Sequence, residues 1–354
     1  MISEKSPNIC AVLHGKKDLR FEKRPIPAIN NNDLLLKIKY VGLCGSDVHQ
    51  WADAQIGEKK FTEPFILGHE VSAMVERCGS EVANFKPGDL VAVEPGKACY
   101  ACYFCKSGQY NLCHSMRFFS TLQPPNDGVL CHYKAHPAHL CFKLPPEVDL
   151  KSGCLVEPMS VAVHACRRAH IEPGSKILVC GAGPIGILSA VVALSSGTVN
   201  VVITDVNDAR LNFAQEFLKE KVQTINVLKT TESECIKKIV KNLKGSSPDV
   251  VLECTGVAAS QRLAIQAVKY GGKIVLVGLG ASITPISTFL IVKKEIEIRG
   301  VFRYTNCFKT TIEFMKTNTV KLNNLITHEF NIFQTETALE TAIEGNCMKI
   351  VLNC

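Results

Sequence analysis

The sequence predicts an α/β protein with a β-rich first domain and a second domain built on a parallel sheet. Its 354 residues, at roughly 150 residues per domain, indicate about two domains. Residues 1 to about 155 contain short β-prone runs separated by glycine and proline. After Pro173-Gly174 strand patterns alternate with helical patterns, which is typical of a parallel sheet with helices on both faces.

The first domain is predicted to be a set of short strands joined by turns. Strand-like runs occupy residues 34–40, 72–77 and 90–93. The segment Lys86-Pro87-Gly88-Asp89 has the composition of a tight turn. We therefore expect a β-rich first domain.

The second domain is predicted to follow a regular strand and helix alternation. Apolar strand runs occupy residues 176–180, 199–204, 222–227, 250–253 and 273–277, and helical patterns fill residues 185–194 and 209–219. The alternation fades after about residue 296, so the rest of the chain need not belong to this domain.

Composition excludes several classes of protein. Hydrophobic residues make up 46% and charged residues 21%, which excludes a largely disordered or coiled-coil chain. The net charge is only +7 and the basic pairs are scattered, so we expect neither a nucleic-acid surface nor a polybasic membrane patch. The most apolar stretch, residues 186–204, is interrupted by Gly197, Thr198 and Asn200 and is not expected to span a membrane.

The 17 cysteines point to a reducing compartment. The first residues carry charges and no long apolar segment, so they do not resemble a secretory signal. We expect a cytoplasmic location in which some cysteines bind metal and the others pack as small apolar side chains.

A glycine-rich motif follows the strand pattern 176–180 and opens the next helix pattern. It consists of Gly181, Ala182, Gly183, Pro184, Ile185 and Gly186. In this context the first glycine permits a tight turn, the second lets the backbone approach a pyrophosphate, and the third lets the helix pack on the strand. The amides of the helix N-terminus would then face the phosphates of a dinucleotide.

The residue that ends the next strand pattern indicates which dinucleotide binds. Asp205 lies 19 residues beyond Gly186, where an acidic side chain accepts hydrogen bonds from the adenine ribose and repels a 2′-phosphate. This favours NAD over NADP. Arg210 leaves an alternative open, since a nearby arginine can hold a 2′-phosphate, contact the pyrophosphate or lie against the adenine. An α/β domain without a ligand is less favoured, because the strand, the glycines, the helix and the acidic residue all match the pattern of a dinucleotide site.

A cluster of cysteines predicts a closed metal site. Cys99, Cys102, Cys105 and Cys113 form a C-x2-C-x2-C-x7-C pattern in a turn-rich segment. Four thiolates at this spacing suit a structural, tetrahedral zinc ion. An iron–sulfur cluster, free thiols, or replacement of one thiolate by His114 are the alternatives.

Other possible ligands are dispersed along the chain. Cys44, His69, Glu70 and Glu157 each have an ordinary interpretation when taken alone, such as a core thiol or a solvated carboxylate. The spacing of these residues along the chain does not predict that they lie close together; only the folded structure could bring them into one site.

Several longer motifs resemble those of the zinc-dependent medium-chain dehydrogenases, and among these the polyol (sorbitol) dehydrogenases. They are GLCGSDVH (42–49), PFILGHE (64–70), KPGDLVAVEPG (86–96), LVEPMSVAVHACRRA (155–169), VCGAGPIG (179–186), ECTG (253–256), GGKIVLVGLG (271–280) and GVFRY (300–304). The resemblance runs from about residue 8 to Cys354. It implies a GroES-like β-rich catalytic domain from residues 1–160 and 297–354, with a Rossmann doubly wound parallel sheet over residues 161–296.

The resemblance also implies a catalytic zinc. Cys44 and His69 match two of its ligands, and Glu157 occupies the place of a second cysteine in the alcohol-specific enzymes. Glu70 is then implied as the third ligand, with Glu157 holding a zinc-bound water or the substrate; which glutamate binds zinc directly stays open. Carboxylate in place of thiolate makes the site harder and suits a substrate with adjacent hydroxyls.

The remaining site residues are implied in the same way. Glu157, Ser46 and Glu70 would serve catalysis. Substrate contacts are implied for Gln50, Phe118, Thr121, Glu157, Arg303 and Tyr304, and cofactor contacts for the glycine motif with Pro184 and Ile185, Asp205, Arg210, Val277, Gly278, Leu279, Val301, Phe302 and Arg303.

The chain departs from the family pattern at three places. Ala73 stands where the zinc signature has a glycine, and Gln50 stands where the mammalian polyol enzymes have a tyrosine. The mammalian enzymes lack the full set of four lobe cysteines, which this chain and some relatives keep. Gln50 keeps a hydrogen-bonding side chain but changes its reach, so we expect it to alter the substrate preference.

These observations together predict a particular activity. We expect an NAD-dependent enzyme with about two zinc ions per chain that interconverts a sugar alcohol and its 2-ketose, sorbitol and fructose first and xylitol next. A homotetramer is implied by the resemblance alone. The alternatives are a related dehydrogenase of secondary alcohols or threonine, and a non-catalytic descendant, which the presence of Cys44, His69 and Glu70 disfavours.

Overall fold

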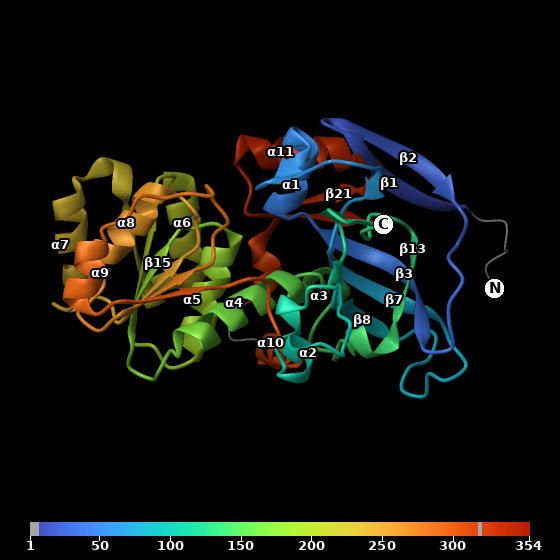
Figure 1. Ribbon diagram of the computed structural model, residues 1–354, viewed down its shortest axis with the longest axis horizontal. Helices are drawn as coiled ribbons and strands as arrows, with labels where there is room; N and C mark the ends of the chain where they lie inside the picture. The colour runs from blue at the N-terminus through green and yellow to red at the C-terminus, as the bar shows by residue number, and fades with distance from the viewer. Residues whose placement is uncertain (1–6, 318–320) are drawn as a thin grey trace. The chain divides into compact units, whose positions relative to one another are not determined.

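The chain folds into two compact units. The computed structural model describes residues 7–317 and 321–354. Unit 1 comprises Met1–Glu157 together with Phe308–Cys354, and unit 2 comprises Pro158–Cys307 (Figure 1). Unit 1 therefore combines both ends of the chain. Unit 2 holds a parallel sheet with helices, so the predicted α/β class is confirmed.

The larger sheet of unit 1 has seven strands. Its order is β14-β8-β7-β3-β22-β21, and β13 also pairs with β3. The strands are β3 (Asp33–Gly42), β7 (Glu70–Cys78), β8 (Leu90–Val93), β13 (Tyr133–Pro137), β14 (Cys141–Lys143), β21 (Ile326–Asn331) and β22 (Lys349–Asn353). Since β22 pairs antiparallel with β3, the end of the chain lies beside an early strand.

A three-stranded sheet and several short elements complete unit 1. The sheet has the order β2-β1-β6, formed by β1 (Asn8–Gly15), β2 (Asp18–Arg24) and β6 (Phe65–Ile66). The helices are α1 (Gly45–Asp53), α2 (Tyr103–Lys106), α3 (Leu150–Gly153), α10 (Phe308–Lys316) and α11 (Thr335–Glu344). Three small ladders are formed by β4 (Gln55–Ile56) with β5 (Lys59–Lys60), β9 (Gly96–Lys97) with β10 (Arg117–Phe118), and β11 (Thr121–Leu122) with β12 (Pro125–Asn126).

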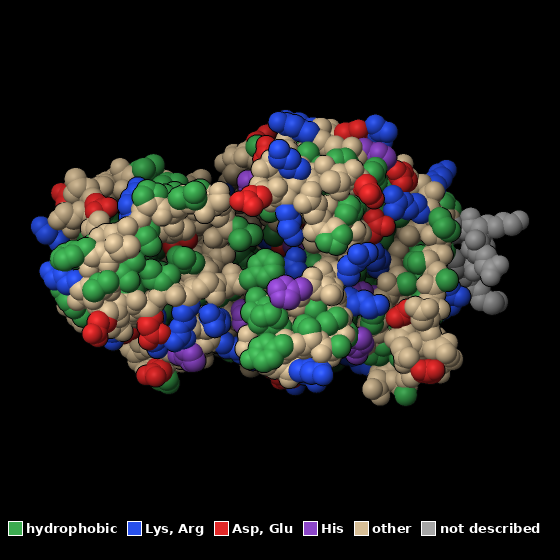
Figure 2. Space-filling view, in the orientation of Figure 1, with side chains coloured by type: hydrophobic (Ala, Val, Ile, Leu, Met, Phe, Trp, Pro, Cys, Tyr) green, Lys and Arg blue, Asp and Glu red, His purple; other side chains and the backbone are tan. Residues whose placement is uncertain are grey.

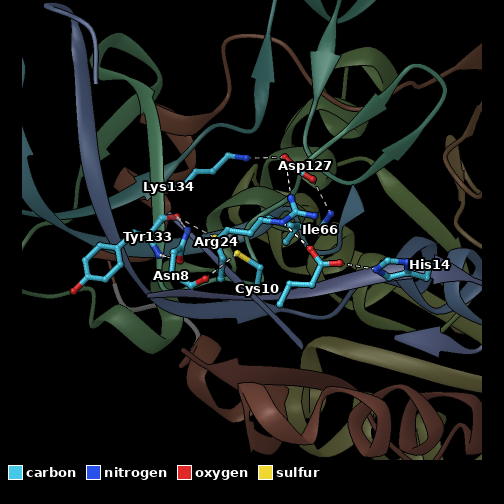
Figure 3. Close-up of polar contacts among 10 residues, drawn as sticks. Asn8, Cys10, His14, Arg24, Ile66, Asp127, Tyr133 and Lys134 are labelled. Carbon is cyan, nitrogen blue, oxygen red and sulfur yellow. Dashed lines mark hydrogen bonds and ion pairs between the residues drawn. The ribbon is translucent and has the colours of Figure 1, made fainter. Parts of the chain in front are cut away.

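A polar network around Asp127 fastens the first strands to the rest of unit 1 (Figure 3). The carboxylate of Asp127 accepts hydrogen bonds from the backbone N–H of Ile66 at 2.9 Å and from the Arg24 guanidinium at 3.1 Å. Its backbone carbonyl accepts from Lys134 at 2.9 Å. Arg24 also pairs with Glu22 on its own strand. One side chain thus joins β2, β6 and the segment before β13.

Unit 2 is a doubly wound sheet of six parallel strands. The order β17-β16-β15-β18-β19-β20 is that of dinucleotide-binding domains, counted from β15 as the first strand. The strands are β15 (Lys176–Cys180), β16 (Asn200–Asp205), β17 (Val222–Asn226), β18 (Val250–Glu253), β19 (Lys273–Leu276) and β20 (Glu297–Gly300). The helices are α5 (Pro184–Ser195), α6 (Asp208–Leu218), α7 (Glu232–Asn242), α8 (Ala258–Ala267) and α9 (Thr288–Lys294), while α4 (Val156–Ala169) begins at the boundary with unit 1.

The structure confirms the predicted strands and helices of this unit and extends the alternation. β15 and β18 have the expected bounds, and the remaining elements differ only at their ends. The sheet continues beyond the expected limit at residue 296, because β20 pairs in parallel with β19. Half-buried and exposed side chains dominate β20, so this strand lacks the apolar run that reveals the others. The predicted domain limits at residues 160 and 296 thus differ from the division seen in the structure.

Two further expectations concern a membrane span and a secretory signal. No helix among the described residues is long and apolar enough to cross a membrane. The expectation that the chain has no secretory signal rests partly on residues 1–6, which lie outside the described residues.

The Asp127 network predicts a measurable loss of stability. Asp127→Ala leaves the buried N–H of Ile66 without its acceptor, so we expect the free energy of unfolding to fall by about 1–3 kcal/mol in urea denaturation. Asp18→Ala, which breaks the exposed pair with Arg20 on β2, is the matched control and should cost no more than about 1 kcal/mol. Equal losses in the two variants would contradict this role of Asp127.

Candidate active site

Three of the predicted metal ligands meet in unit 1. The ligand atoms of Cys44, His69 and Glu70 all lie within 4.8 Å of one another. His69 and Glu70 are buried, and Cys44 is partly exposed. A thiolate, an imidazole and a carboxylate at this spacing form a donor set that suits zinc and leaves a coordination position open.

Local backbone structure explains why these ligands meet. Cys44 follows β3 and is the N-cap of α1, whereas Glu70 begins β7. The register of the two strands places Gly42 opposite Glu70. A Cβ at Gly42 would come within 2.1 Å of the Glu70 carboxylate, so only glycine leaves room for this side chain.

Asp47 is a site residue that sequence reasoning missed. It lies in the first turn of α1 with no exposed surface, and its carboxylate approaches His69 Nδ1 at 3.5 Å. It also accepts hydrogen bonds from the Ser120 hydroxyl at 2.8 Å and from the backbone N–H groups of Cys44 and Gly68, each at 3.2 Å. A carboxylate in this place orients a ligating imidazole. The capping-box spacing from Cys44 to Asp47 is the sequence signal that could have found it.

Lys349 is a second site residue that was missed. It begins β22, is 3% exposed, and donates to Glu70 Oε1 at 2.6 Å and to the backbone carbonyl of Leu43 at 3.0 Å. It also contacts Glu70 Oε2. Lys349 thus compensates the buried charge of a candidate metal ligand from the far end of the sequence.

The charges around the ligands shift the pKa values of these groups. Burial alone would lower the pKa of His69, but the negative charges of Asp47 and Cys44 raise it well above its usual range. Burial would raise the pKa of Asp47, yet His69 and the hydrogen bonds from Ser120 and Cys44 hold it below its usual value. The site therefore presents the negative potential that a cation requires.

The other predicted residues of unit 1 have varied surroundings. Ser46 is half-buried on α1, and the ring of Phe118 packs on His69 with a centroid distance of 5.6 Å. Thr121 donates its hydroxyl to the backbone carbonyls of Phe118 and Pro124. Gln50 is 2% exposed and donates to Ser120 O at 3.0 Å, while its Oε1 has no hydrogen-bond partner among the described residues.

The remaining predicted site residues are Glu157, Arg303 and Tyr304. Glu157 is buried in the first turn of α4 and is not a member of the group whose ligand atoms lie within 4.8 Å. Arg303, in the left-handed region with φ 55°, and the buried Tyr304 belong to unit 2. The guanidinium of Arg303 lies over the Phe302 ring at 4.7 Å from its centroid.

The four predicted lobe cysteines also meet. The ligand atoms of Cys99, Cys102, Cys105 and Cys113 lie within 4.8 Å of one another. Cys99 Sγ accepts from the backbone N–H of Cys102, and Cys113 Sγ accepts from that of Cys99. Hydrogen bonds from the Ala101 and Cys102 backbone lower the pKa of Cys99 to about 6, whereas desolvation raises that of Cys105 to about 12. The ring of His114 packs on Phe104.

The glycine motif of unit 2 has the form expected of a dinucleotide turn. Gly181 has φ 103° and turns the chain after β15, and Gly183 is the N-cap of α5. A Cβ at Gly186 would come within 1.8 Å of Gly181 O, so glycine is required for the helix to pack on the turn. A Cβ at Gly183 would meet nothing within 4 Å, which leaves open space at the helix N-terminus for a phosphate group. Pro184 and Ile185 form the first turn of α5.

Asp205 contacts this turn, and Arg210 follows it in the next helix. The carboxylate of Asp205, at the end of β16, accepts from the Ala182 N–H at 2.7 Å and from the N–H groups of Val206 and Asn207. Arg210 lies in α6, and its buried Nε has no partner among the described residues. A buried guanidinium N–H without a partner can donate to an oxygen of a bound ligand.

The remaining cofactor candidates follow the ends of neighbouring strands. The N–H groups of Val277 and Gly278 donate to Glu253 O at 2.8 and 2.9 Å, and Val301 N donates to Leu276 O at 3.0 Å. Leu279 and Phe302 are exposed, at 75% and 46%. Carboxyl ends of parallel strands form the edge of such sheets at which ligands bind.

The buried ion pair at Lys349 yields a prediction. Lys349→Met leaves the Glu70 charge uncompensated, so we expect the free energy of unfolding to fall by about 3–5 kcal/mol without metal. Zinc should recover part of this loss, because a bound cation neutralises the same carboxylate. Urea denaturation with and without added zinc measures both effects. A loss that zinc does not change would contradict a link between Lys349 and the metal ligands.

Two families match the parts of the chain that hold these sites. Residues 30–146 match the alcohol dehydrogenase GroES-like domain, and residues 184–317 match the zinc-binding dehydrogenase family. The first match contains the three meeting ligands and the cysteine lobe, and the second contains most of the dinucleotide site.

Relatives of known activity resemble the chain over its whole length. Sorbitol dehydrogenase of Macaca fascicularis is 43% identical over 350 residues, covering 99% of this chain and 97% of the relative. Sorbitol dehydrogenase of Bos taurus is 42% identical over 354 residues, covering 100% and 98%.

Solved structures show the same fold. An Escherichia coli oxidoreductase of unknown specificity is 32% identical with a TM-score of 0.92, covering 98% of this chain and 99% of the other. L-idonate 5-dehydrogenase of Escherichia coli is 28% identical with a TM-score of 0.91, covering 99% of each. The chain is therefore an oxidoreductase that acts on CH–OH groups, and it belongs to the zinc-dependent medium-chain dehydrogenases, with the sorbitol dehydrogenases.

Proposed function

We propose that this enzyme oxidises a sugar alcohol at C2 to the corresponding 2-ketose, with NAD as the hydride acceptor. The observation that carries the proposal is the grouping of Cys44, His69 and Glu70 in a chain that matches sorbitol dehydrogenases from end to end. Sorbitol and fructose are the leading pair, and xylitol is the next substrate.

Zinc is the metal that the donors fit. Cys44, His69 and Glu70 would hold it, with Glu157 as the further carboxylate toward a bound water or substrate. Zinc in this place supplies Lewis acidity that lowers the pKa of a polyol hydroxyl. The cysteine lobe would hold a second, structural zinc, so we propose about two zinc ions per chain.

The chain's own residues would bind the polyol and move its proton. We assign proton transfer to Glu157 and Ser46, and substrate hydrogen bonds to Arg303, Tyr304 and Gln50. The unpartnered Oε1 of Gln50 supports its role, because a buried acceptor without a donor suits a hydroxyl of the substrate. Phe118 and Thr121 would line the same space through the ring and methyl group.

NAD is the cofactor that unit 2 favours. Asp205 at the end of β16 would accept from the ribose hydroxyls, and Arg210 would bind the adenosine phosphates. Val277, Gly278, Leu279, Val301, Phe302 and Arg303 would hold the nicotinamide end. NAD supplies the hydride chemistry, and the chain supplies its position.

We also propose a homotetramer in the cytoplasm. β20 is the edge strand of the unit 2 sheet, and α9 beside it exposes Phe289 at 72% and Val292 at 77%. Figure 2 shows hydrophobic side chains over the part of unit 2 where α8 and α9 lie. An edge strand with apolar neighbours suits pairing with a second copy. The cysteines, which are free thiols in the structure, support a reducing compartment.

Deuterium transfer tests the proposed reaction. Oxidation of sorbitol labelled with deuterium at C2 should give unlabelled fructose and should transfer the deuterium to NADH. Mass spectrometry of the NADH detects the label. NADH formation without the label would place the oxidation at another carbon. Turnover of 2,3-butanediol or threonine with no turnover of any polyol would favour the alternative, a dehydrogenase of secondary alcohols or threonine.

Two glycine variants separate cofactor binding from folding. Gly183→Ala should cost less than about 1 kcal/mol of stability but weaken NADH binding, because the methyl group enters the space kept for a phosphate. Gly186→Ala should cost about 1–3 kcal/mol or more, because its Cβ overlaps Gly181 O. Fluorescence titration with NADH and urea denaturation measure the two effects. Unchanged NADH affinity in Gly183→Ala would contradict the assignment.

Asp47 provides a test of the metal site. Asp47→Asn should lower zinc affinity by about 10–100-fold, because His69 loses the carboxylate that orients it. Competition with a chromogenic chelator measures this affinity without any turnover. Asp53→Asn, on the exposed face of the same helix next to His49, is the matched control and should leave affinity unchanged. Equal zinc affinity in both variants would refute a role for Asp47 toward the metal.

A further inference from the structure

We propose that Glu253 is the positioning residue for the cofactor-binding turns of unit 2. The proposal rests on the proposed binding of NAD. Glu253 ends β18, has no exposed surface and is the first residue of the ECTG motif, to which the sequence analysis assigned no role. Its carboxylate and its backbone carbonyl hold two different segments next to the glycine motif.

The carboxylate organises the loop that follows β18. It accepts hydrogen bonds from the backbone N–H groups of Thr255 at 2.9 Å and Gly256 at 3.0 Å, and from the Ser260 hydroxyl at 2.9 Å. The Thr255 hydroxyl also contacts it closely. These partners are neutral N–H and O–H groups, so the carboxylate is solvated by the loop itself and by the first turn of α8.

The backbone carbonyl of the same residue holds the second segment. It accepts from the N–H groups of Val277 at 2.8 Å and Gly278 at 2.9 Å, which are the residues that leave β19. The side chain and main chain of Glu253 therefore fix residues 254–257 and 277–278 relative to each other.

The fixed loop touches both proposed cofactor turns. A Cβ at Gly278 would come within 2.2 Å of Gly256 N, and one at Gly280 within 1.8 Å of Gly256 O. On the other side, a Cβ at Gly181 would lie 2.9 Å from the Thr255 methyl carbon. The loop is thus wedged between the pyrophosphate turn and the turn after β19. Displacement of the loop should disturb at least one of these turns, because Gly256 lies against Gly278 and Gly280, and the Thr255 methyl group lies against Gly181.

Substitution of the carboxylate by an amide tests this role. Glu253→Gln keeps the size and shape of the side chain, but its amide N–H group faces loop donors that need an acceptor. The loop after β18 should therefore lose some of the hydrogen bonds that position it. We expect the Kd for NADH, measured by fluorescence titration, to rise by about tenfold or more. Zinc content should stay unchanged, and KM for NAD should rise more than KM for sorbitol. Asp249→Asn, just before the opposite end of β18, is the matched control and should leave the Kd unchanged.

The outcomes separate this proposal from the proposed function. Failure of the unaltered enzyme to bind NADH would refute the cofactor assignment itself. Normal NADH binding in the unaltered enzyme and in a folded Glu253→Gln variant would overturn only the role of Glu253. If Glu253→Gln does not fold, Ser260→Ala removes one donor to the carboxylate, and its Kd for NADH should rise; an unchanged Kd would then overturn the proposal.

Discussion

The charge of Glu70 has to be compensated inside the protein, and unit 1 is arranged around that need. The carboxylate is 1% exposed, lies beside Cys44 and His69, and pairs with Lys349. Lys349 reaches it because β22 lies against β3, which ends just before Cys44. The end of the chain must therefore return to the first domain, and the parallel sheet is inserted between the two parts. A buried ion pair of this kind is weak as a source of stability but costly to break, so it specifies the arrangement.

Buried carboxylates serve as organising centres in both units. Asp47 joins α1, His69 and Ser120 through its two oxygens, and Glu253 joins the loop before α8 to the turn after β19. Each is satisfied by several donors, as a buried anion requires. Glycines complete both arrangements, because Gly42 clears space for Glu70 and Gly256, Gly278 and Gly280 let two loops touch. Charge and close backbone approach thus position the groups proposed to bind zinc and NAD.

Sequence reasoning succeeds where the determinants are local. The glycine motif, the cysteine lobe and the strands with apolar runs are each encoded within a short segment, and the structure shows them as expected. β20 was missed because its side chains are half-exposed at the edge of the sheet. Lys349 could not be predicted, since 279 residues separate it from Glu70 and no local pattern distinguishes it. The meeting of Cys44 with His69 and Glu70 needed a family resemblance, because only strand pairing brings them together.

The proposed oxidation of a polyol by NAD depends on an open zinc site in unit 1, with a closed zinc site in the cysteine lobe. The most direct measurement is zinc per chain by elemental analysis, paired with sorbitol-dependent NAD reduction during mild chelation. We expect about two zinc ions per chain and a loss of activity that follows removal of the first ion. Full activity in a preparation without zinc would contradict this role of zinc.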